Sequence, residues 1–216
     1  MKVLILAANG QIAQLVEKQI LTAPQFKDVE LTLFLRHTER LAALQNQPRV
    51  TLIEGNLDDA AAVDRAIAGQ ELVFVAVVDH TADNRWTHHV IDGMTRHHVR
   101  RVIFTNILGL YHEVPGEFGR WNQQQVARGL PAAIQSDQLL AQSGLIYTTL
   151  RLPWLNDRDE VRYQVTHRNE PYVGVSGSRQ SVADLVLRII ATPEFGANDS
   201  LGLADPSTQG ESRPVY

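Results

Sequence analysis

Short runs of apolar residues alternate along the chain with segments whose apolar residues recur every three or four positions. A continuous apolar run is typical of a strand that is buried on both faces, and the three-to-four spacing predicts an amphipathic helix. The alternation of the two patterns favours a parallel sheet with helices on both faces. The predicted strands cover residues 3–7, 31–35, 50–53, 72–78, 101–105 and 146–150.

The segments between these runs predict helices. The first covers 11–21, and a short second one has Thr38 as N-cap with Leu41 and Leu44 facing inward. The third begins at Asp58 and Asp59, the fourth runs through Trp86 to Met94, and the fifth extends from Pro131 to Gly144. The last begins with a capping box over Ser181 to Asp184. The segment from Asn106 to Leu130 holds four glycines and a proline, so we expect a loop that covers the carboxyl edge of the sheet. The polar tail over 206–216 is expected to lie loosely.

Length and composition place these elements in one domain. A chain of 216 residues with 44% hydrophobic content can bury a full core, and single α/β domains commonly reach this size. The expected fold is a Rossmann-type doubly wound parallel sheet, a three-layer single domain over residues 1–216.

Charge and residue content also exclude several classes of partner. The net charge of −4 and the scattered Lys and Arg residues argue against a nucleic-acid surface. The apolar run 72–78 is too short to span a membrane, and the N-terminus shows no cleavable apolar segment. The chain has no cysteine, which suits a reducing cytoplasm. We therefore expect a cytoplasmic protein without a membrane or nucleic-acid partner, and leave a homodimer open.

The loop after the first strand is the first candidate for chemistry. A dinucleotide-binding loop has three glycines that allow a tight turn, backbone approach to the pyrophosphate and close helix packing. Here Gly10 is kept, while Ala7 and Ala13 stand at the outer positions. We expect Asn9, Gly10 and the amides of Gln11 and Ile12 to face the anion at the helix N-terminus. An ordinary strand-to-helix turn is the alternative.

The end of the second strand indicates which dinucleotide is bound. In a site for NAD a carboxylate at this point accepts hydrogen bonds from the ribose, whereas the 2′-phosphate of NADP needs a cation. Arg36 stands there, Arg40 follows one turn later, and no acid precedes Glu39. The sequence therefore predicts NADP(H), and the alternative is that Arg36 is a solvated charge at a strand end.

Asn56 and Leu57, after the third strand, are expected where the adenine would rest. The Asn56 amide can donate to and accept from a purine edge, and a turn-forming asparagine is the alternative.

Several segments, taken in order, resemble the atypical short-chain dehydrogenase/reductase family. Within it, the small NAD(P)H-binding proteins similar to NmrA-like regulators and to biliverdin and flavin reductases match best. The segments that carry this resemblance are 8–12, Arg36, 54–58, 143–151 and 178–183. The resemblance implies a Rossmann domain with NADP(H) in the crevice at the carboxyl ends of the strands, and in some members an oxidoreductase activity.

The resemblance also implies cofactor contacts from further segments. These are Ala76 and Val77 after the fourth strand, Thr105, and Trp154 with Leu155. Leu152-Pro153 replaces the Pro-Gly that the family usually has before the last of these segments.

The chain departs from the family in its catalytic residues. Reductases of the family commonly pair a tyrosine acid with a lysine four residues later, and counting back from Ser143 puts Gly129 and Ala133 at those positions. Asn106 and Tyr111 are the remaining candidate donors to a substrate carbonyl, and Tyr111 as a packed lid residue is the alternative.

The absence of the tyrosine and lysine limits the substrates that we expect the protein to reduce. Reduction of a ketone needs a positioned proton donor, whereas a quinone or a flavin accepts a hydride and draws its proton from solvent. We therefore expect NADPH oxidation with a quinone- or flavin-type acceptor. The alternative is a non-catalytic NADP(H) sensor of the NmrA-like type, and an isomerase or epimerase is a third possibility that also depends on the missing acid.

No metal site is expected. His88-His89 and His97-His98 are adjacent pairs, which cannot share one helical face, and the spacing between the pairs is not a ligand pattern.

Overall fold

One eight-stranded sheet forms the centre of the computed structural model, which describes residues 1–216. The strand order is β3-β2-β1-β4-β5-β6-β10-β8, and every pair is parallel except β10 with β8. A separate pair, β7 with β9, is parallel. The strands are β1 Lys2–Leu6, β2 Glu30–Leu35, β3 Val50–Glu54, β4 Leu72–Val75, β5 Arg101–Ile107, β6 Ile146–Leu152, β7 Trp154–Asn156, β8 Gln164–Thr166, β9 Ser176–Ser178 and β10 Asp199–Ala204.

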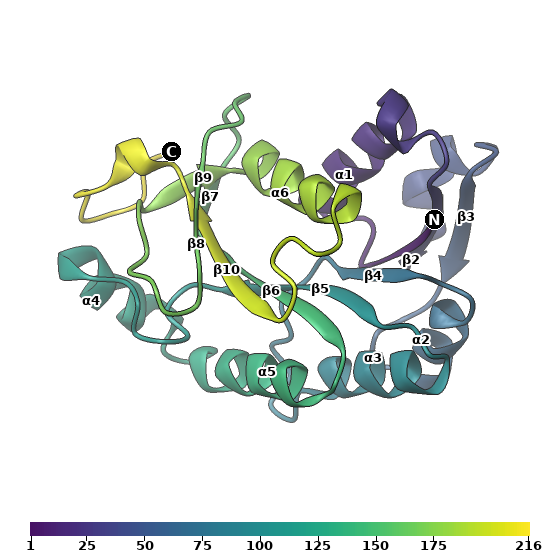
Figure 1. The fold of residues 1–216 in the computed structure, drawn as a ribbon, viewed down its shortest axis with the longest axis horizontal. Coiled ribbons are helices and arrows are strands. Elements are labelled where there is room, and N and C mark those ends of the chain that lie inside the picture. The colour runs from purple at the N-terminus through teal and green to yellow at the C-terminus, as the bar shows by residue number, and fades with distance from the viewer.

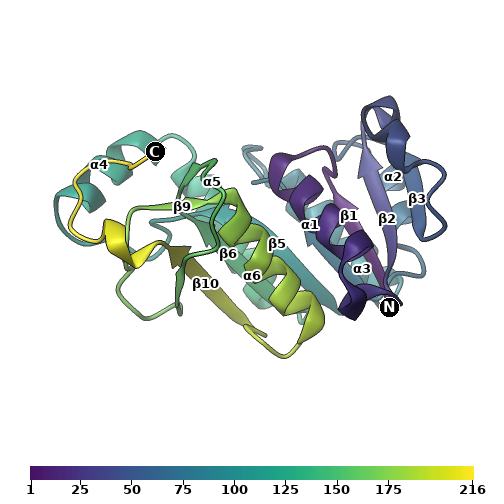
Figure 2. The same ribbon diagram turned by 90° about the horizontal axis from the view of Figure 1, so that it is seen from above.

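Helices cover both faces of this sheet (Figure 1). Helices α1 and α6 lie side by side over one face, as Figure 2 shows from above, and α2, α3 and α5 cover the other. The helices are α1 Gln11–Thr22, α2 Ala60–Ile67, α3 Arg85–Arg96, α4 Gly116–Val126, α5 Leu130–Gln142 and α6 Arg179–Ala191, with 3-10 turns at Pro24–Phe26, Thr38–Leu44 and Pro206–Thr208. The predicted three-layer Rossmann-type single domain is confirmed.

The core is divided by the sheet into two parts. A cluster of 24 buried residues, with Val16 of α1 and Leu185 of α6, fills the space on one face. A cluster of 18, with Val63 of α2 and Met94 of α3, fills the other. Successive residues of a strand point to opposite faces of the sheet, so that Ile5 belongs to the first cluster and Leu6 to the second. Because both faces are buried, the sequence of each parallel strand is an unbroken apolar run. None of the helices has the length and apolar character needed to cross a lipid bilayer.

The expected loop over residues 106–130 is wrong in its middle. Strand β5 continues to Ile107, and α4 occupies Gly116–Val126. Of the residues that predict a loop, Pro115 is the N-cap of this helix, and Gly116 and Gly119 lie in its first turn. The helix is stabilised by tertiary packing of Phe118 and by burial of Asn122, a polar side chain that the apolar periodicity does not count.

Two predicted helix starts are also wrong. Helix α6 begins two residues before Ser181, because Ser178 is its N-cap and its hydroxyl accepts a hydrogen bond from the Ser181 amide at 2.9 Å. The N-cap before the turn at residues 38–44 is His37, and the Thr38 hydroxyl instead donates to Glu54 at 3.4 Å. By contrast, Asp59 caps α2 and accepts from two amides, as the sequence predicts.

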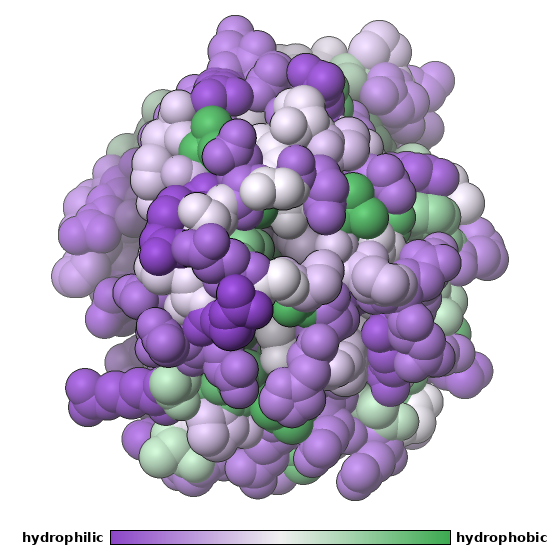
Figure 3. Space-filling model, turned by 90° about the vertical axis from the view of Figure 1, so that its left-hand side faces the viewer, coloured by the Kyte–Doolittle hydropathy of each residue, from purple (hydrophilic) through white to green (hydrophobic).

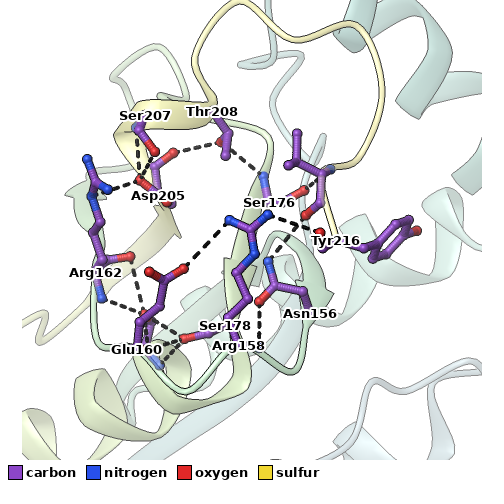
Figure 4. Close-up of polar contacts among 12 residues, drawn as sticks. Asn156, Arg158, Glu160, Arg162, Ser176, Ser178, Asp205, Ser207, Thr208 and Tyr216 are labelled. Atoms are coloured by element: carbon purple, nitrogen blue, oxygen red, sulfur yellow. Dashed lines mark hydrogen bonds and ion pairs between the residues drawn. The ribbon is translucent and has the colours of Figure 1, made fainter.

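The C-terminal part of the chain differs most from expectation. No strand is predicted after Leu150, yet β7, β8, β9 and β10 follow. The tail over 206–216, expected to lie loosely, is tied to β7 and β9, as Figure 4 shows. The Val215 amide donates to Ser176 Oγ at 2.8 Å, and the Thr208 hydroxyl accepts from the Val175 amide at 2.8 Å. Strand β4 also ends at Val75, which leaves Val77 and Val78 in the following loop.

Candidate cofactor-binding site

The strand order reverses between β1 and β4, and this reversal creates the crevice of a doubly wound sheet. The loops that leave β1, β2, β3 and β4 at their carboxyl ends surround a cavity of about 320 Å³. Its lining is Ala7, Asn9, Gly10, Phe34, Leu35, Arg36, His37, Arg40, Gly55, Asn56, Leu57, Asp58, Ala76, Val77 and Trp86.

The loop between β1 and α1 offers free backbone donors. Gly10 is the N-cap of α1 and supplies no side-chain cap, and no hydrogen bond in the chain uses the amides of Gln11, Ile12 or Ala13. A Cβ added at Gly10 would lie 3.4 Å from the Ala7 carbonyl oxygen and 3.7 Å from that of Ala76, which are ordinary contact distances. Free amides at the positive end of a helix dipole suit a pyrophosphate.

Ala7 has an unfavourable backbone conformation in this turn. Its φ of 61° lies in the left-handed region that favours glycine. The family pattern has glycine at this position, so the alanine keeps the geometry at the expense of backbone strain.

Aromatic and apolar side chains form the walls of the cavity. The Phe34 ring fits against the bare backbone of Gly55, where an added Cβ would lie 2.3 Å from the ring. Trp86, from α3, is fixed by a 2.9 Å hydrogen bond from its Nε1 to Asp58 Oδ1. Asn56 Oδ1 accepts from the Asp58 amide at 3.2 Å, so this side chain also stabilises its own turn. Flat apolar walls of this kind suit a purine ring.

Two guanidinium groups lie at the mouth of the cavity. Arg36 and Arg40 are both exposed, both line the cavity, and neither forms an ion pair within the chain. The neighbouring Glu39 pairs instead with His37, Oε1 to Nδ1 at 3.2 Å. The guanidinium groups of Arg36 and Arg40 are therefore free to bind a phosphate group of a ligand.

The structure brings together seven of the residues expected to bind the cofactor. Asn9, Gly10, Arg36, Asn56, Leu57, Ala76 and Val77 line the cavity. Gln11 and Ile12 are expected to bind through their backbone amides, which are free. Their side chains and the remaining expected residues lie outside the cavity. The Gln11 side chain lines a separate groove with Arg179 and Gln180 of α6, and Ile12 packs against the core. Thr105 is buried within β5, and Trp154 and Leu155 lie in β7.

Sequence reasoning missed Phe34, His37 and Trp86. Phe34 reads as a core residue of β2, although its position one residue before the strand end was a signal that it could reach the crevice. Trp86 is far from the loop motifs in sequence, and only the packing of α3 against α2 carries it to the cavity.

The candidate proton donors Asn106 and Tyr111 make their hydrogen bonds inside the protein. Asn106 is 1% exposed, its Nδ2 donates to the Ala133 carbonyl at 2.9 Å, and its Oδ1 accepts from the Ile107 amide. The Tyr111 hydroxyl donates to the buried Asp137 carboxylate. Burial and this carboxylate raise the pKa of Tyr111 above its usual range, so it is a poor acid. Neither side chain gains support as a catalytic group.

The positions that hold a tyrosine and a lysine in related reductases carry no reactive side chain. Gly129 is the N-cap of α5, and Ala133 is fully buried in the same helix. A Cβ at Gly129 would lie 3.5 Å from His80 Nδ1, so the loop after β4 closely approaches this point.

Comparison with known proteins identifies the family. The family model described as NAD(P)H-binding matches residues 7–193. The chain belongs to this NAD(P)H-binding family of Rossmann-fold proteins. It is an atypical short-chain dehydrogenase/reductase, as the sequence motifs indicate, and the expected nicotinamide dinucleotide cofactor is confirmed.

Solved structures agree with this assignment. A short-chain dehydrogenase/reductase from Veillonella parvula in complex with NADP is 26% identical with a TM-score of 0.91, and the match covers 100% of this chain and 99% of that one. A Rossmann-fold NAD(P)-binding family protein from Shigella flexneri is 32% identical with a TM-score of 0.77, over 100% and 98% of the two chains.

A third structure shares the fold. The anaerobillin reductase ChuY from Escherichia coli O157:H7 is 19% identical with a TM-score of 0.78, over 98% and 100% of the two chains. Among curated proteins, no sequence matches this chain significantly.

Proposed function

We propose that this protein is an NADPH-dependent oxidoreductase that passes a hydride to a quinone- or flavin-type acceptor. The observation that carries the cofactor preference is the pair of free guanidinium groups, Arg36 and Arg40, at the mouth of a cavity lined by the ends of β1 to β4. A 2′-phosphate would give these groups an anionic partner, whereas the ribose hydroxyls of NADH would leave both unpaired.

The residues present fit the rest of the cofactor. Phe34, Leu57 and Trp86 would contact the adenine, and the free amides after Gly10 would bind the pyrophosphate. When bound, NADPH would supply the hydride. The complex of the Veillonella protein with NADP supports the same assignment.

The choice of acceptor follows from the proton-donating groups of the chain. Gly129 and Ala133 cannot donate a proton, and Asn106 and Tyr111 are hydrogen-bonded inside the protein. A quinone or flavin takes the hydride, which carries two electrons, and the proton that completes its reduction can come from water. A simple ketone would instead need an acid held next to its oxygen.

Calorimetric titration of NADPH and NADH tests the cofactor preference. Arg36→Gln should weaken NADPH binding by on the order of 1–3 kcal/mol and NADH binding much less, because only NADPH makes the charge-assisted contact. Arg100→Gln is the matched control, since Arg100 is exposed and has no ion pair. It directly precedes β5 and so lies at the amino ends of the strands, away from the cavity at their carboxyl ends. Equal losses for the two cofactors would refute the role of Arg36.

A screen of acceptors tests the reaction. Purified protein with NADPH should reduce a quinone or free flavin and should turn over simple ketones slowly. Rapid ketone turnover would contradict the proposal. A blank screen with NADPH binding intact would favour the alternative function, a redox sensor that binds NADP(H) without turnover.

A further inference from the structure

An imidazole lines the cofactor cavity together with the two guanidinium groups, and the proposed function gives it no role. His37 directly follows Arg36 and lines the same cavity as Arg36 and Arg40. Its side chain is 56% exposed. A phosphate group that reaches the two guanidinium groups therefore also approaches the imidazole of His37.

The backbone that carries His37 is fixed by hydrogen bonds. His37 is the N-cap of the 3-10 turn that begins at Thr38, and its carbonyl accepts from the Arg40 amide at 3.1 Å. The Thr38 hydroxyl donates to Glu54 at the end of β3 at 3.4 Å. The imidazole and the Arg40 guanidinium therefore extend from one ordered turn beside the cavity.

One nitrogen of the His37 ring is already in contact with a carboxylate. His37 Nδ1 lies 3.2 Å from Glu39 Oε1. Because a carboxylate oxygen accepts a proton and has none to donate, this contact favours the ring proton on Nδ1. In the neutral imidazole Nε2 then has no proton, whereas in the imidazolium both nitrogens are donors. His37 can therefore donate to a ligand through Nε2 only when the ring takes up a second proton.

The charges around this imidazole oppose one another in the free protein. Glu39 favours the imidazolium, and the adjacent cations Arg36 and Arg40 disfavour it. The other two acids nearby have partners of their own, because Glu54 accepts from a threonine hydroxyl at 3.4 Å and Asp58 accepts from the indole of the cavity wall at 2.9 Å. An anion bound by the two guanidinium groups would change this balance in favour of the imidazolium.

From these contacts we infer that His37 is a third ligand of the 2′-phosphate, and that NADPH binding is coupled to the uptake of one proton from solvent by its imidazole. A phosphate dianion neutralises the two guanidinium groups and itself favours a cation, so the imidazolium becomes the preferred form. Its Nδ1 keeps the contact with Glu39, and its Nε2 donates to the phosphate. The ribose hydroxyl of NADH brings no charge, so binding of NADH leaves the ring neutral.

The inference rests on the proposed function, because it concerns the phosphate that Arg36 and Arg40 are proposed to bind. It adds that the choice between the two cofactors depends on pH. As pH rises the imidazolium becomes harder to form, so the NADPH affinity should fall relative to the NADH affinity.

Calorimetry in two buffers measures the proton directly. At about pH 7.5 a phosphate monoester, with a second pKa of about 6, is already a dianion, and an ordinary imidazole is mostly neutral. Proton uptake from the buffer makes the observed binding enthalpy differ between Pipes and Tris, which have small and large ionisation enthalpies. The wild-type protein should take up protons when it binds NADPH and none when it binds NADH. His37→Gln should abolish the uptake and weaken NADPH several-fold, with NADH unchanged.

Two further variants separate the charge of His37 from its mere presence. His88→Gln is the matched control, since His88 is also exposed but lies on α3 outside the lining of the cavity, and it should leave the uptake and both affinities unchanged. Glu39→Gln should reduce the uptake at this pH, because only the phosphate then favours the imidazolium. A purely steric role of His37 would leave the proton uptake the same in all three variants.

The outcomes keep the two proposals apart. Proton uptake that is equal for NADPH and NADH, absent for both, or unchanged in His37→Gln would overturn the role of His37. Any of these results together with a loss of NADPH preference in Arg36→Gln would contradict this inference alone and leave the proposed phosphate site intact. Equal affinities of the wild-type protein for the two cofactors would contradict both.

Discussion

At the scale of single residues, the crevice is made by positions where the backbone departs from its easiest conformation or approaches a neighbour closely. Ala7 has a positive φ, and Gly55 leaves room for the Phe34 ring. The sequence indicates Gly10 as a binding position because the motif contains it. It does not reveal that Phe34 and Trp86 form the walls, since both read as core residues of their elements.

The strain at Ala7 can be measured. Ala7→Gly should raise the free energy of unfolding by about 0.5–1 kcal/mol, because relief of the left-handed conformation exceeds the entropy that glycine adds to the unfolded chain. Urea denaturation followed by circular dichroism provides the measurement. Ala13→Gly is the control, since Ala13 is helical and buried, and its replacement should destabilise the protein. A loss of stability in Ala7→Gly would contradict this account.

At the scale of elements, the sequence predicts best where one segment determines its own structure. The six apolar runs are all strands, and Asp59 caps α2 as its position suggests. It fails where tertiary contacts decide, as in α4, whose glycines predict a loop, and in β7, β8 and β9, which have three residues each. It also fails in β10, where Ser200 and Gly202 interrupt the apolar run. Residues 206–216 read as a loose tail because their partners, such as Ser176, are distant in sequence.

Helix α1 contains a buried glutamate that its pattern of apolar positions does not explain. Glu17 of α1 is 2% exposed, and its Oε1 has no hydrogen-bond partner. Burial raises the pKa of Glu17 to about 8. A carboxyl that costs free energy to ionise in the folded state makes stability depend on pH.

The direction of this dependence follows from proton binding. Between the ordinary glutamate pKa and about 8 the folded protein holds a proton on Glu17 that the unfolded chain has lost, so stability should fall as pH rises through this range. Glu17→Gln should remove a decline on the order of 2–4 kcal/mol. Urea denaturation at pH 5.5 and pH 8 checks this, with exposed Glu30→Gln as control. Equal pH dependence in Glu17→Gln and wild type would refute it.

At the scale of the whole molecule, the dinucleotide cavity occupies only part of the carboxyl edge of the sheet. The ends of β1 to β4 form the cavity with Arg36 and Arg40, and the ends of β5 and β6 lead to Trp154 beside α4. Seen from the side of α4, the surface is mostly hydrophilic with small separate apolar patches (Figure 3). The family and its dinucleotide are established by the chain's match to NAD(P)H-binding proteins, and the preference for the 2′-phosphate is the central claim.

The most direct test of that claim uses only the part of the cofactor that the cavity is proposed to hold. Adenosine 2′,5′-bisphosphate and adenosine 5′-monophosphate differ by the 2′-phosphate alone, and calorimetry gives the affinity of the wild-type protein for each. If Arg36 and Arg40 bind this group, the bisphosphate should bind about tenfold more tightly or better. Equal affinities for the two nucleotides would contradict the account.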